Sequence, residues 1–205
     1  MRQQVLVAAI AALLVCGSAH AATIWNEGVS GDLSNNQAAP TALALGVGVN
    51  SIIGTVNGTG DSQDFVRLTV GAGQTLTQVT LAVYASADVQ GFTGFQAGTS
   101  FVGSPFAAAS YAGYAHFGTG AQNGALPPAN LVGQDLLPIM ANPALASGAT
   151  GFVPPLGPGD YTFLIQQLGG ATSYQFDYVV VPEPASLALL ALGLAGLVAA
   201  ARRRA

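Results

Sequence analysis

Lysine is absent from this sequence of 205 residues, and charged residues of all kinds make up only 7% of it. An ordinary globular protein carries roughly a quarter. Arg67 is the single arginine between the two chain ends and stands against eight acids, so the middle of the chain has a net charge of −7. Binding of nucleic acid needs clustered basic side chains that neutralise phosphates. The composition therefore argues against a nucleic-acid partner.

Cysteine and histidine are almost absent as well. Cys16 is the only cysteine, and it lies in an N-terminal segment that we expect to be removed, which leaves His116 as the only histidine of the mature chain. Without thiols, the mature chain cannot be a disulfide scaffold or a thiol enzyme. One histidine cannot supply a zinc site either. We expect His116 to be an ordinary, partly buried or surface histidine.

The first 22 residues have the pattern of a secretory signal peptide. Arg2 supplies the positive start, residues 5–15 form an uncharged run of 11 residues, and Ala19-His20-Ala21 offers a small-x-small cleavage pattern. We predict cleavage after Ala21 or Ala22. A helix of that length rises about 16 Å, roughly half of a bilayer core, which argues against a retained anchor.

A second apolar run spans residues 185–201, and Arg202, Arg203 and Arg204 follow it directly. The run carries no charge and would span about 25 Å as a helix, which is the short limit for crossing a bilayer. Basic residues stay on the cytoplasmic side of a membrane. We therefore predict a single transmembrane helix, with the three arginines as its membrane stop signal and all preceding residues outside the cytoplasm.

Pro182-Glu183-Pro184 stands just before this run, and its two prolines predict a break in any strand and an extended stretch open to a protease. Together with the apolar run and the arginine cluster, the tripeptide makes residues 181–205 resemble the PEP-CTERM sorting signal. The resemblance implies an exported bacterial protein that exosortase, an integral-membrane enzyme, recognises and processes. It also implies transit through the inner membrane of a Gram-negative-type bacterium and delivery to the cell surface or to an extracellular matrix rich in exopolysaccharide.

The middle of the chain, residues 23–180, is dominated by patterns typical of strands. In one of them Val66, Leu68 and Val70 share a face, and in another Val79, Leu81 and Val83 do so. Similar period-two runs occur at residues 161–165 and 174–180. Turn signals separate the runs, and no long amphipathic helix competes with them. We predict a mainly β domain, an antiparallel β-sandwich or jelly roll, flanked by the N-terminal signal helix and the C-terminal transmembrane helix.

Three short landmarks in this domain resemble those of pre-peptidase C-terminal domains. They are Asp61-Ser62-Gln63-Asp64-Phe65, Ala72-Gly73-Gln74-Thr75-Leu76 and Gly159-Asp160-Tyr161-Thr162-Phe163. The resemblance implies a jelly-roll β-sandwich on a secreted bacterial protein. Such a module is non-catalytic, often binds carbohydrate or another substrate, and sometimes binds calcium.

Residues 91–158 depart from a compact version of that domain. They are rich in glycine, alanine and proline and lack a clear period, so we expect a long insertion made of loops. Its aromatic residues are Phe92, Phe95, Phe101, Phe106, Tyr111, Tyr114 and Phe117. These rings could stack on sugars or form the core of a second sheet layer. We expect core, because most aromatic side chains are buried for packing.

Calcium is the one metal that this composition allows, because it prefers carboxylate and carbonyl oxygens on flexible loops. Asp61 and Asp64, which precede a predicted strand, are the candidate ligands. A second group of candidates follows the signal peptide: Glu27, Asp32, Asn35 and Asn36. Asp61 and Asp64 could instead cap a turn by accepting from neighbouring amides. We favour capping, since no complete calcium-loop pattern is present.

These patterns favour a non-enzymatic protein that is exported, sorted by exosortase, and built around a binding or structural β-sandwich near exopolysaccharide. No cofactor besides calcium is expected. The alternative is a secreted hydrolase that acts on polysaccharide or peptide through carboxylates in residues 91–158. An enzyme would bring carboxylates together in a deep cleft, whereas a binding module would present a shallow aromatic face.

Overall fold

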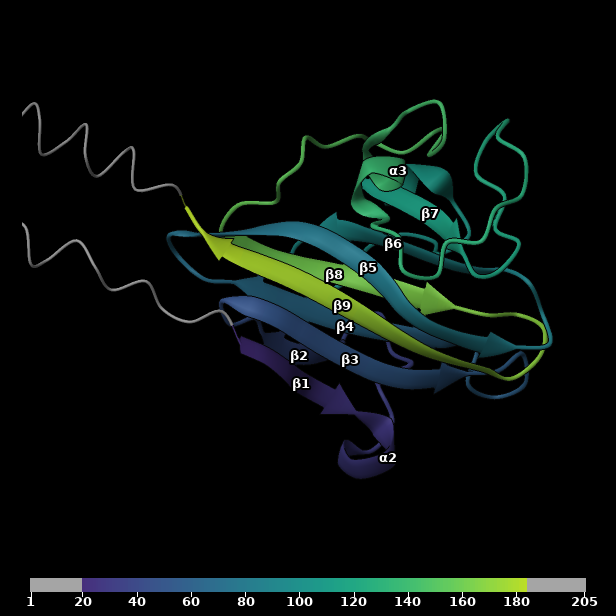
Figure 1. Cartoon of the computed structure of the whole chain (residues 1–205), viewed down its shortest axis with the longest axis horizontal. Helices are drawn as coiled ribbons and strands as arrows, with labels where there is room; N and C mark the ends of the chain where they lie inside the picture. Colours follow the sequence, from purple (N-terminus) through teal and green to yellow (C-terminus); the bar gives the residue numbers. More distant parts are fainter. Residues whose placement is uncertain (1–19, 184–205) are drawn as a thin grey trace, which may run out of the picture.

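The computed structural model describes residues 20–183, which form a sandwich of two β-sheets (Figure 1). Residues 1–19 and 184–205 lie outside the described part of the chain. Most of the predicted signal peptide, Pro184, the predicted transmembrane helix and the three terminal arginines therefore lie outside it as well.

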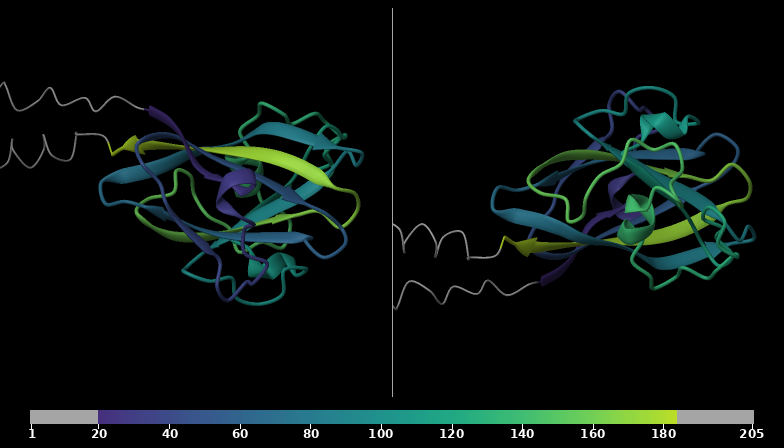
Figure 2. Two further views of the ribbon diagram at one scale, coloured as in Figure 1. Left: turned by 90° about the horizontal axis from the view of Figure 1, so that it is seen from below. Right: turned by 90° about the horizontal axis from the view of Figure 1, so that it is seen from above.

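One sheet has four strands and the other has five. The four-stranded sheet has the order β1-β3-β9-β5, with β1 (His20–Asn26), β3 (Gly48–Val56), β9 (Thr172–Pro182) and β5 (Gln74–Ser86). The five-stranded sheet has the order β2-β4-β8-β6-β7, with β2 (Thr41–Ala44), β4 (Gln63–Val70), β8 (Gly159–Gln166), β6 (Gly91–Ala97) and β7 (Gly113–Phe117). The two layers can be followed in Figure 2.

Most neighbouring strands are antiparallel, but each sheet has a parallel pair at one edge. β1 runs parallel to β3, and β2 runs parallel to β4. The reason is the path of the chain, which alternates between the two sheets from β1 to β4, so that each parallel pair is separated in sequence by a strand of the other sheet. The predicted β-sandwich is confirmed, whereas purely antiparallel pairing is wrong at these two edges.

The core lies between the sheets and is built from the inward residues of the alternating strands. Val66, Leu68 and Val70 of β4 are buried, as their spacing predicted. Phe163 of β8 is fully buried in the same core and stacks on Phe95 of β6, with 5.0 Å between the ring centroids. Burial of one such side chain contributes about 1.5–3 kcal/mol.

One predicted face is wrong in β5. Val79 and Leu81 are buried, but Val83 is 46% exposed. The register of β5 against β9 shifts between Leu81 and Val83, so that Leu81 pairs with Phe176 and Val83 already pairs with Gln175. An irregularity of this kind rotates the residues that follow it to the opposite face of the sheet.

Residues 91–158 are not an insertion of loops alone, which corrects our expectation. They begin with β6 and β7, and β6 is an interior strand between β8 and β7. The pattern is hidden because glycines occupy positions where apolar residues would reveal a strand: a Cβ on Gly91 or Gly94 would run into the ring of Phe117 or Tyr111. The remainder carries a 3₁₀ turn, η2 (Ala108–Ser110), and a short helix, α3 (Leu137–Ala141).

The two ends of the described chain lie at the same end of the sandwich (Figure 1). β1 begins at His20 and pairs Ala21 and Ala22 with β3, so the predicted signal-peptide boundary falls inside a strand. At the other end β9 continues through Pro182, which corrects the expectation that this proline breaks the strand. No helix within residues 20–183 has the length and the apolar character that a bilayer crossing requires.

Candidate functional site

Four carboxylates gather at one corner of the sandwich, and we refer to Glu27, Asp32, Asp61 and Asp64 as the acidic cluster. Glu27 is the first residue of the short helix α2 (Glu27–Ser30), Asp32 follows that helix, and Asp64 lies near the start of β4. Carboxylate oxygens of these three residues all lie within 4.8 Å of one another. Asp61 belongs to the loop that leads into β4, and its charge acts on Asp64.

Asp64 is the buried member of the acidic cluster, with no exposed surface. Its Oδ2 accepts a hydrogen bond of 2.5 Å from the hydroxyl of Tyr174 in β9, and its Oδ1 has no partner within the described residues. Gly54 in β3 makes room for that hydroxyl, because a Cβ at this position would overlap it. A buried carboxylate oxygen without a partner is costly.

Burial is the main reason why the pKa of Asp64 rises from its ordinary value to about 8. The bond from Tyr174 lowers the pKa, whereas the negative charges of Glu27, Asp61 and Asp32 raise it further. At neutral pH this carboxyl is therefore protonated unless a cation compensates its charge.

Glu27 is held in place by backbone and side-chain donors from two sides. Its Oε1 accepts from the Leu33 amide at 3.1 Å, and its Oε2 accepts from the Thr55 amide at 2.7 Å and from the Thr55 hydroxyl at 3.1 Å. Burial still raises its pKa, and the charge of Asp32 contributes in the same direction. Burial and the charge of Asp32 raise the pKa of Asp61 as well.

The Asn35 amide lies between Asp61 Oδ1 and the Gln63 carbonyl and donates to both, at 3.0 Å to Asp61. This hydrogen bond lowers the pKa of Asp61, against the effect of burial.

The residues present fit a calcium ion. They offer several carboxylate oxygens, one of them buried and unpartnered, and no ion pair with Arg67, the only arginine or lysine in residues 20–183, neutralises them. The predicted pair Asp61 and Asp64 is close to the second predicted group, which the sequence could not show. Capping by these two aspartates is wrong, because within residues 20–183 Asp64 accepts from the Tyr174 hydroxyl and Asp61 from the Asn35 amide, and neither carboxylate accepts from a neighbouring backbone amide. Asn57 caps the turn instead: its Oδ1 accepts from the Thr59 amide at 2.9 Å.

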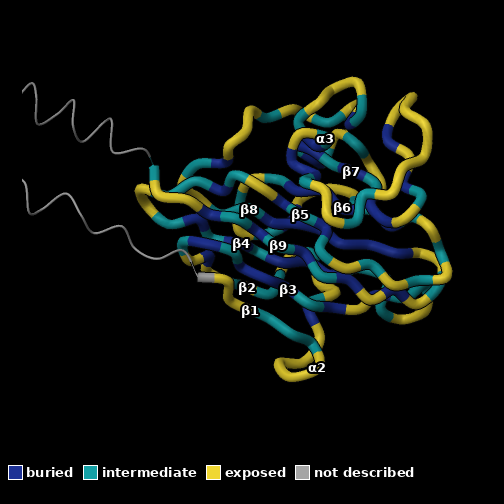
Figure 3. The backbone as a smooth tube through the Cα atoms, in the orientation of Figure 1, coloured by how far each residue is buried: buried dark blue, intermediate teal, exposed yellow. Residues whose placement is uncertain are grey.

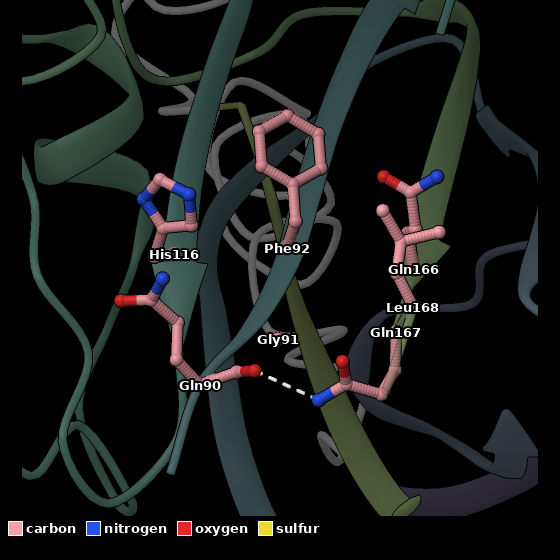
Figure 4. A pocket seen from close by; sticks show the side chains of 7 residues that line it. All are labelled: Gln90, Gly91, Phe92, His116, Gln166, Gln167 and Leu168. Carbon is pink, nitrogen blue, oxygen red and sulfur yellow. Dashed lines mark hydrogen bonds between the residues drawn. The ribbon is translucent and has the colours of Figure 1, made fainter. Parts of the chain in front are cut away.

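A second feature lies on the outer face of the five-stranded sheet, and we call it the outer groove. One half is a cavity of about 230 Å³ (Figure 4). It is lined by Gln90, Gly91, Phe92, His116, Gln166, Gln167 and Leu168. The other half is a cavity of about 270 Å³, lined by Phe92, Pro105, Phe106, Ala108, Tyr111, Tyr114 and Gln166. Because Phe92 and Gln166 line both halves, the two cavities adjoin.

Strand register explains why these side chains meet. Phe92 of β6 pairs with Gln166 of β8 on one side and with His116 of β7 on the other. Paired residues point to the same face of a sheet. Tyr114 lies two residues before His116, so it joins the same face, and its ring lies 5.5 Å from that of Phe92.

The outer groove is polar without being charged. Gln166 is 5% exposed, and its Nε2 has no partner within the described residues. Gln167 donates to the Gln90 carbonyl at 2.7 Å, which closes one end of the cavity (Figure 4). Burial lowers the pKa of His116, whose ring meets Phe92 edge to face at 5.6 Å, so the imidazole is neutral at pH 7.

The seven aromatic residues of the 91–158 region divide between core and groove. Core packing is confirmed for Phe95 and Phe117 in the main core, and for Phe101 and Tyr111 in a second buried cluster. Tyr111 also lines the groove. Phe92 and Tyr114 are half-buried, and Phe106 is 69% exposed. The groove amides were missed by the sequence analysis, and the only available signal was the polar pair Gln166-Gln167 directly after the apolar run of β8.

Comparison with known proteins identifies the tail of the chain. Residues 180–204 match the PEP-CTERM protein-sorting motif, so the predicted sorting signal is confirmed. The match implies an exported protein that is held transiently in the membrane and processed by exosortase. No curated protein matches the chain.

Among solved structures, the chain is similar to the pre-peptidase C-terminal domain of collagenase from Bacillus anthracis. Sequence identity is 14%, the match covers 72% of this chain and 98% of that domain, and the TM-score is 0.32. The neighbour bears the family name that the three landmarks predicted.

Proposed function

We propose that the β-sandwich is a non-catalytic module that binds a neutral polysaccharide of the extracellular matrix through the outer groove, after export and sorting. The observation that carries this proposal is the pairing of Phe92, an aromatic surface, with Gln166, a buried amide that has an unused donor. Sugar rings present C–H faces that pack on aromatic rings and hydroxyls that accept from amides.

The charge of the groove supports an uncharged glycan. Among the described residues, no Asp, Glu, Lys or Arg side chain lines either half, and the His116 imidazole is neutral. The sandwich as a whole is acidic, with Arg67 as its single arginine. An anionic polysaccharide would therefore be repelled at long range and would find no cation in the groove.

A non-catalytic role is supported by the place of the one acid in the 91–158 region. Asp135 Oδ1 accepts from the Val79 amide and from the Leu137 amide, both at 3.0 Å, so it joins α3 to the edge of β5. The rival proposal of a hydrolase would need a pair of carboxylates at the groove. These two hydrogen bonds give Asp135 a structural role instead.

We assign the acidic cluster a structural role that is separate from the groove. Calcium held by Glu27, Asp32, Asp61 and Asp64 would tie α2 and the loop before β4 to the core and would supply charge compensation for Asp64. It would take no part in a reaction.

The position of the groove suits a protein that is anchored through its tail. Gln166 ends β8, and Pro182 ends β9, and the two strands point to opposite ends of the sandwich (Figure 1). The half of the groove nearest the end of β8 therefore lies at the end of the sandwich opposite the C-terminal end of β9.

The test is a screen of residues 20–183 against neutral and acidic glycans. We expect binding to one or more neutral glycans, loss of that binding in Gln166→Ala, and retention in Val153→Ala, a matched truncation of an exposed apolar side chain outside the groove. Binding to acidic glycans alone, or binding that survives Gln166→Ala, would contradict the proposal.

A further inference from the structure

The sorting motif begins inside the sheet, and no linker separates it from the folded domain. β9 lies between β3 and β5, and its last core residue, Val180, is fully buried and pairs with Gly48 on one side and Leu76 on the other. Val181 pairs with Thr75, and Pro182 pairs with Gln74. Glu183, the next residue of the motif, is also hydrogen-bonded to the sandwich.

Glu183 is attached to the turn between β4 and β5. Its amide donates to the Gly73 carbonyl at 2.8 Å, and Gly73 adopts a positive φ of 71° in this turn. Two of the three residues of Pro182-Glu183-Pro184 are thus part of the sandwich. A single residue, Val181, stands between the motif and the buried core.

This docking conflicts with what a processing enzyme needs. Enzymes that cleave peptide bonds act on exposed segments or on segments that open locally. The backbone of a paired strand is occupied by its neighbours, and the bulk of the sandwich lies directly beside it.

We propose that Val181, Pro182 and Glu183 must detach from β5 and from the turn at Gly73 before exosortase can process the chain. The folded sandwich thereby limits the rate of its own sorting. This inference rests on the sorting motif and is independent of what the outer groove binds.

The local contacts explain why detachment can stop before Val180, the first buried residue of the strand from its C-terminal end. Val181 is exposed, and Pro182 has no amide proton to give to the sheet. Strand ends of this kind open at much lower cost than core strands. Val180 is the next residue, and pulling it out would expose core, so the sandwich stays folded while three residues are released.

The first test inserts Gly-Ser-Gly-Ser between Val181 and Pro182 in the full chain and follows its maturation by pulse labelling in an exosortase-positive host. We expect maturation several-fold faster than in the wild type. The control is the same insertion between Leu126 and Pro127, in an exposed loop, which should leave the rate unchanged. A wild-type rate for the first insertion would overturn the proposal.

The second test locks the strand end with a disulfide. Thr75→Cys with Val181→Cys places two cysteines on paired residues, in a mature chain that otherwise has none once the predicted signal peptide with Cys16 is removed. We expect processing to stop when the disulfide forms and to resume on reduction, with Thr75→Cys alone as the control. A locked chain that matures at the wild-type rate would show that exosortase accepts the docked strand, against the proposal.

Discussion

Both faces of the five-stranded sheet carry aromatic residues, but the inner face forms the core and the outer face forms the groove. On the inner face, Phe95 and Phe163 are covered by the other sheet, where Tyr178 meets Phe163 edge to face at 5.4 Å. On the outer face, Phe92 and Tyr114 are only half-buried, beside Pro105 and Phe106 from the chain between β6 and β7. Buried residues follow the strands of the sandwich, and exposed residues lie mainly in the loops (Figure 3). Aromatic content therefore does not tell core from binding surface. Whether an aromatic side chain belongs to the core or to a binding surface depends on which elements cover its face of the sheet.

Buried polar residues sharpen the same comparison. Within residues 20–183, Asp64 faces inward and has one unpaired oxygen in the acidic cluster, whereas Gln166 faces outward and has one unpaired donor in an uncharged groove. The first arrangement calls for a cation and the second for a neutral ligand with acceptors. The inner and the outer face can therefore be tested with different ligands.

The largest expected effect is on the inner face. Phe163→Ala removes a fully buried ring from the centre of the sandwich, and we expect a loss of about 3–5 kcal/mol in the free energy of unfolding, through lost burial and a residual cavity. Denaturant unfolding of residues 20–183 measures it. A loss below about 1 kcal/mol would mean that the two sheets do not share the tight core described here.

The next effect concerns calcium. If calcium binds only the folded state, a hundredfold excess over its dissociation constant should add about 2.7 kcal/mol to the free energy of unfolding. We expect the melting temperature of the wild type to rise in calcium relative to chelator, and Asp64→Asn to lose that response. Equal melts of the wild type in both buffers would contradict a calcium site in the acidic cluster.

A smaller effect should appear in chelator over the narrow range of pH 6.5 to 8. The folded pKa of Asp64, about 8, lies above its unfolded value of 3.8, so the folded state keeps a proton that the unfolded state has lost. Stability therefore falls as pH rises between these values, by up to about 1.4 kcal/mol per unit.

The useful window for this measurement is pH 6.5 to 8. His116, whose folded pKa is lowered by burial, costs stability only below its ordinary pKa of 6.5. We expect wild-type stability to decline across the window and Asp64→Asn, which cannot ionise, to show a flatter profile and a higher stability at pH 8. If the stability of both proteins changed with pH in the same way, ionisation of Asp64 would not be the cause of the decline.

The smallest effect on stability belongs to the outer face. Phe106 is largely exposed at the second half of the groove, so Phe106→Ala should change the free energy of unfolding by less than about 0.5 kcal/mol. We expect it to weaken binding of the glycan found in the screen by about tenfold, which corresponds to 1.4 kcal/mol. Isothermal titration calorimetry measures the affinity for the glycan, and an unchanged affinity would exclude Phe106 from the binding surface.

Much of the fold could be predicted because strand patterns are local. The runs in β4, β8 and β9 repeat every two residues, and each run assigns its own faces. The same rule failed where a local irregularity or a glycine altered the pattern, as in β5 after Leu81 and in β6 around Gly94. An irregularity depends on the partner strand, which the pattern of one strand does not contain.

The candidate sites could be predicted only in fragments. Asp61 and Asp64 were candidate calcium ligands, and Glu27 and Asp32 belonged to a second group of candidates. The two groups lie about thirty residues apart in sequence, so nothing local joined them into one cluster. Asp64 meets Tyr174 across 110 positions of sequence. Gln166 and His116 gave no sign of a shared groove, because β8 and β7 become near neighbours only through β6.

The sequence by itself determined the sorting tail and the β class of the domain, because these depend on composition and on patterns within a few residues. Only the tertiary structure decided that separate acids form one cluster, that aromatic residues divide between core and groove, and that the sorting motif begins as the end of a central strand. Each of these depends on pairing between distant segments, and that pairing is set by burial of the whole core rather than by any one stretch of the chain.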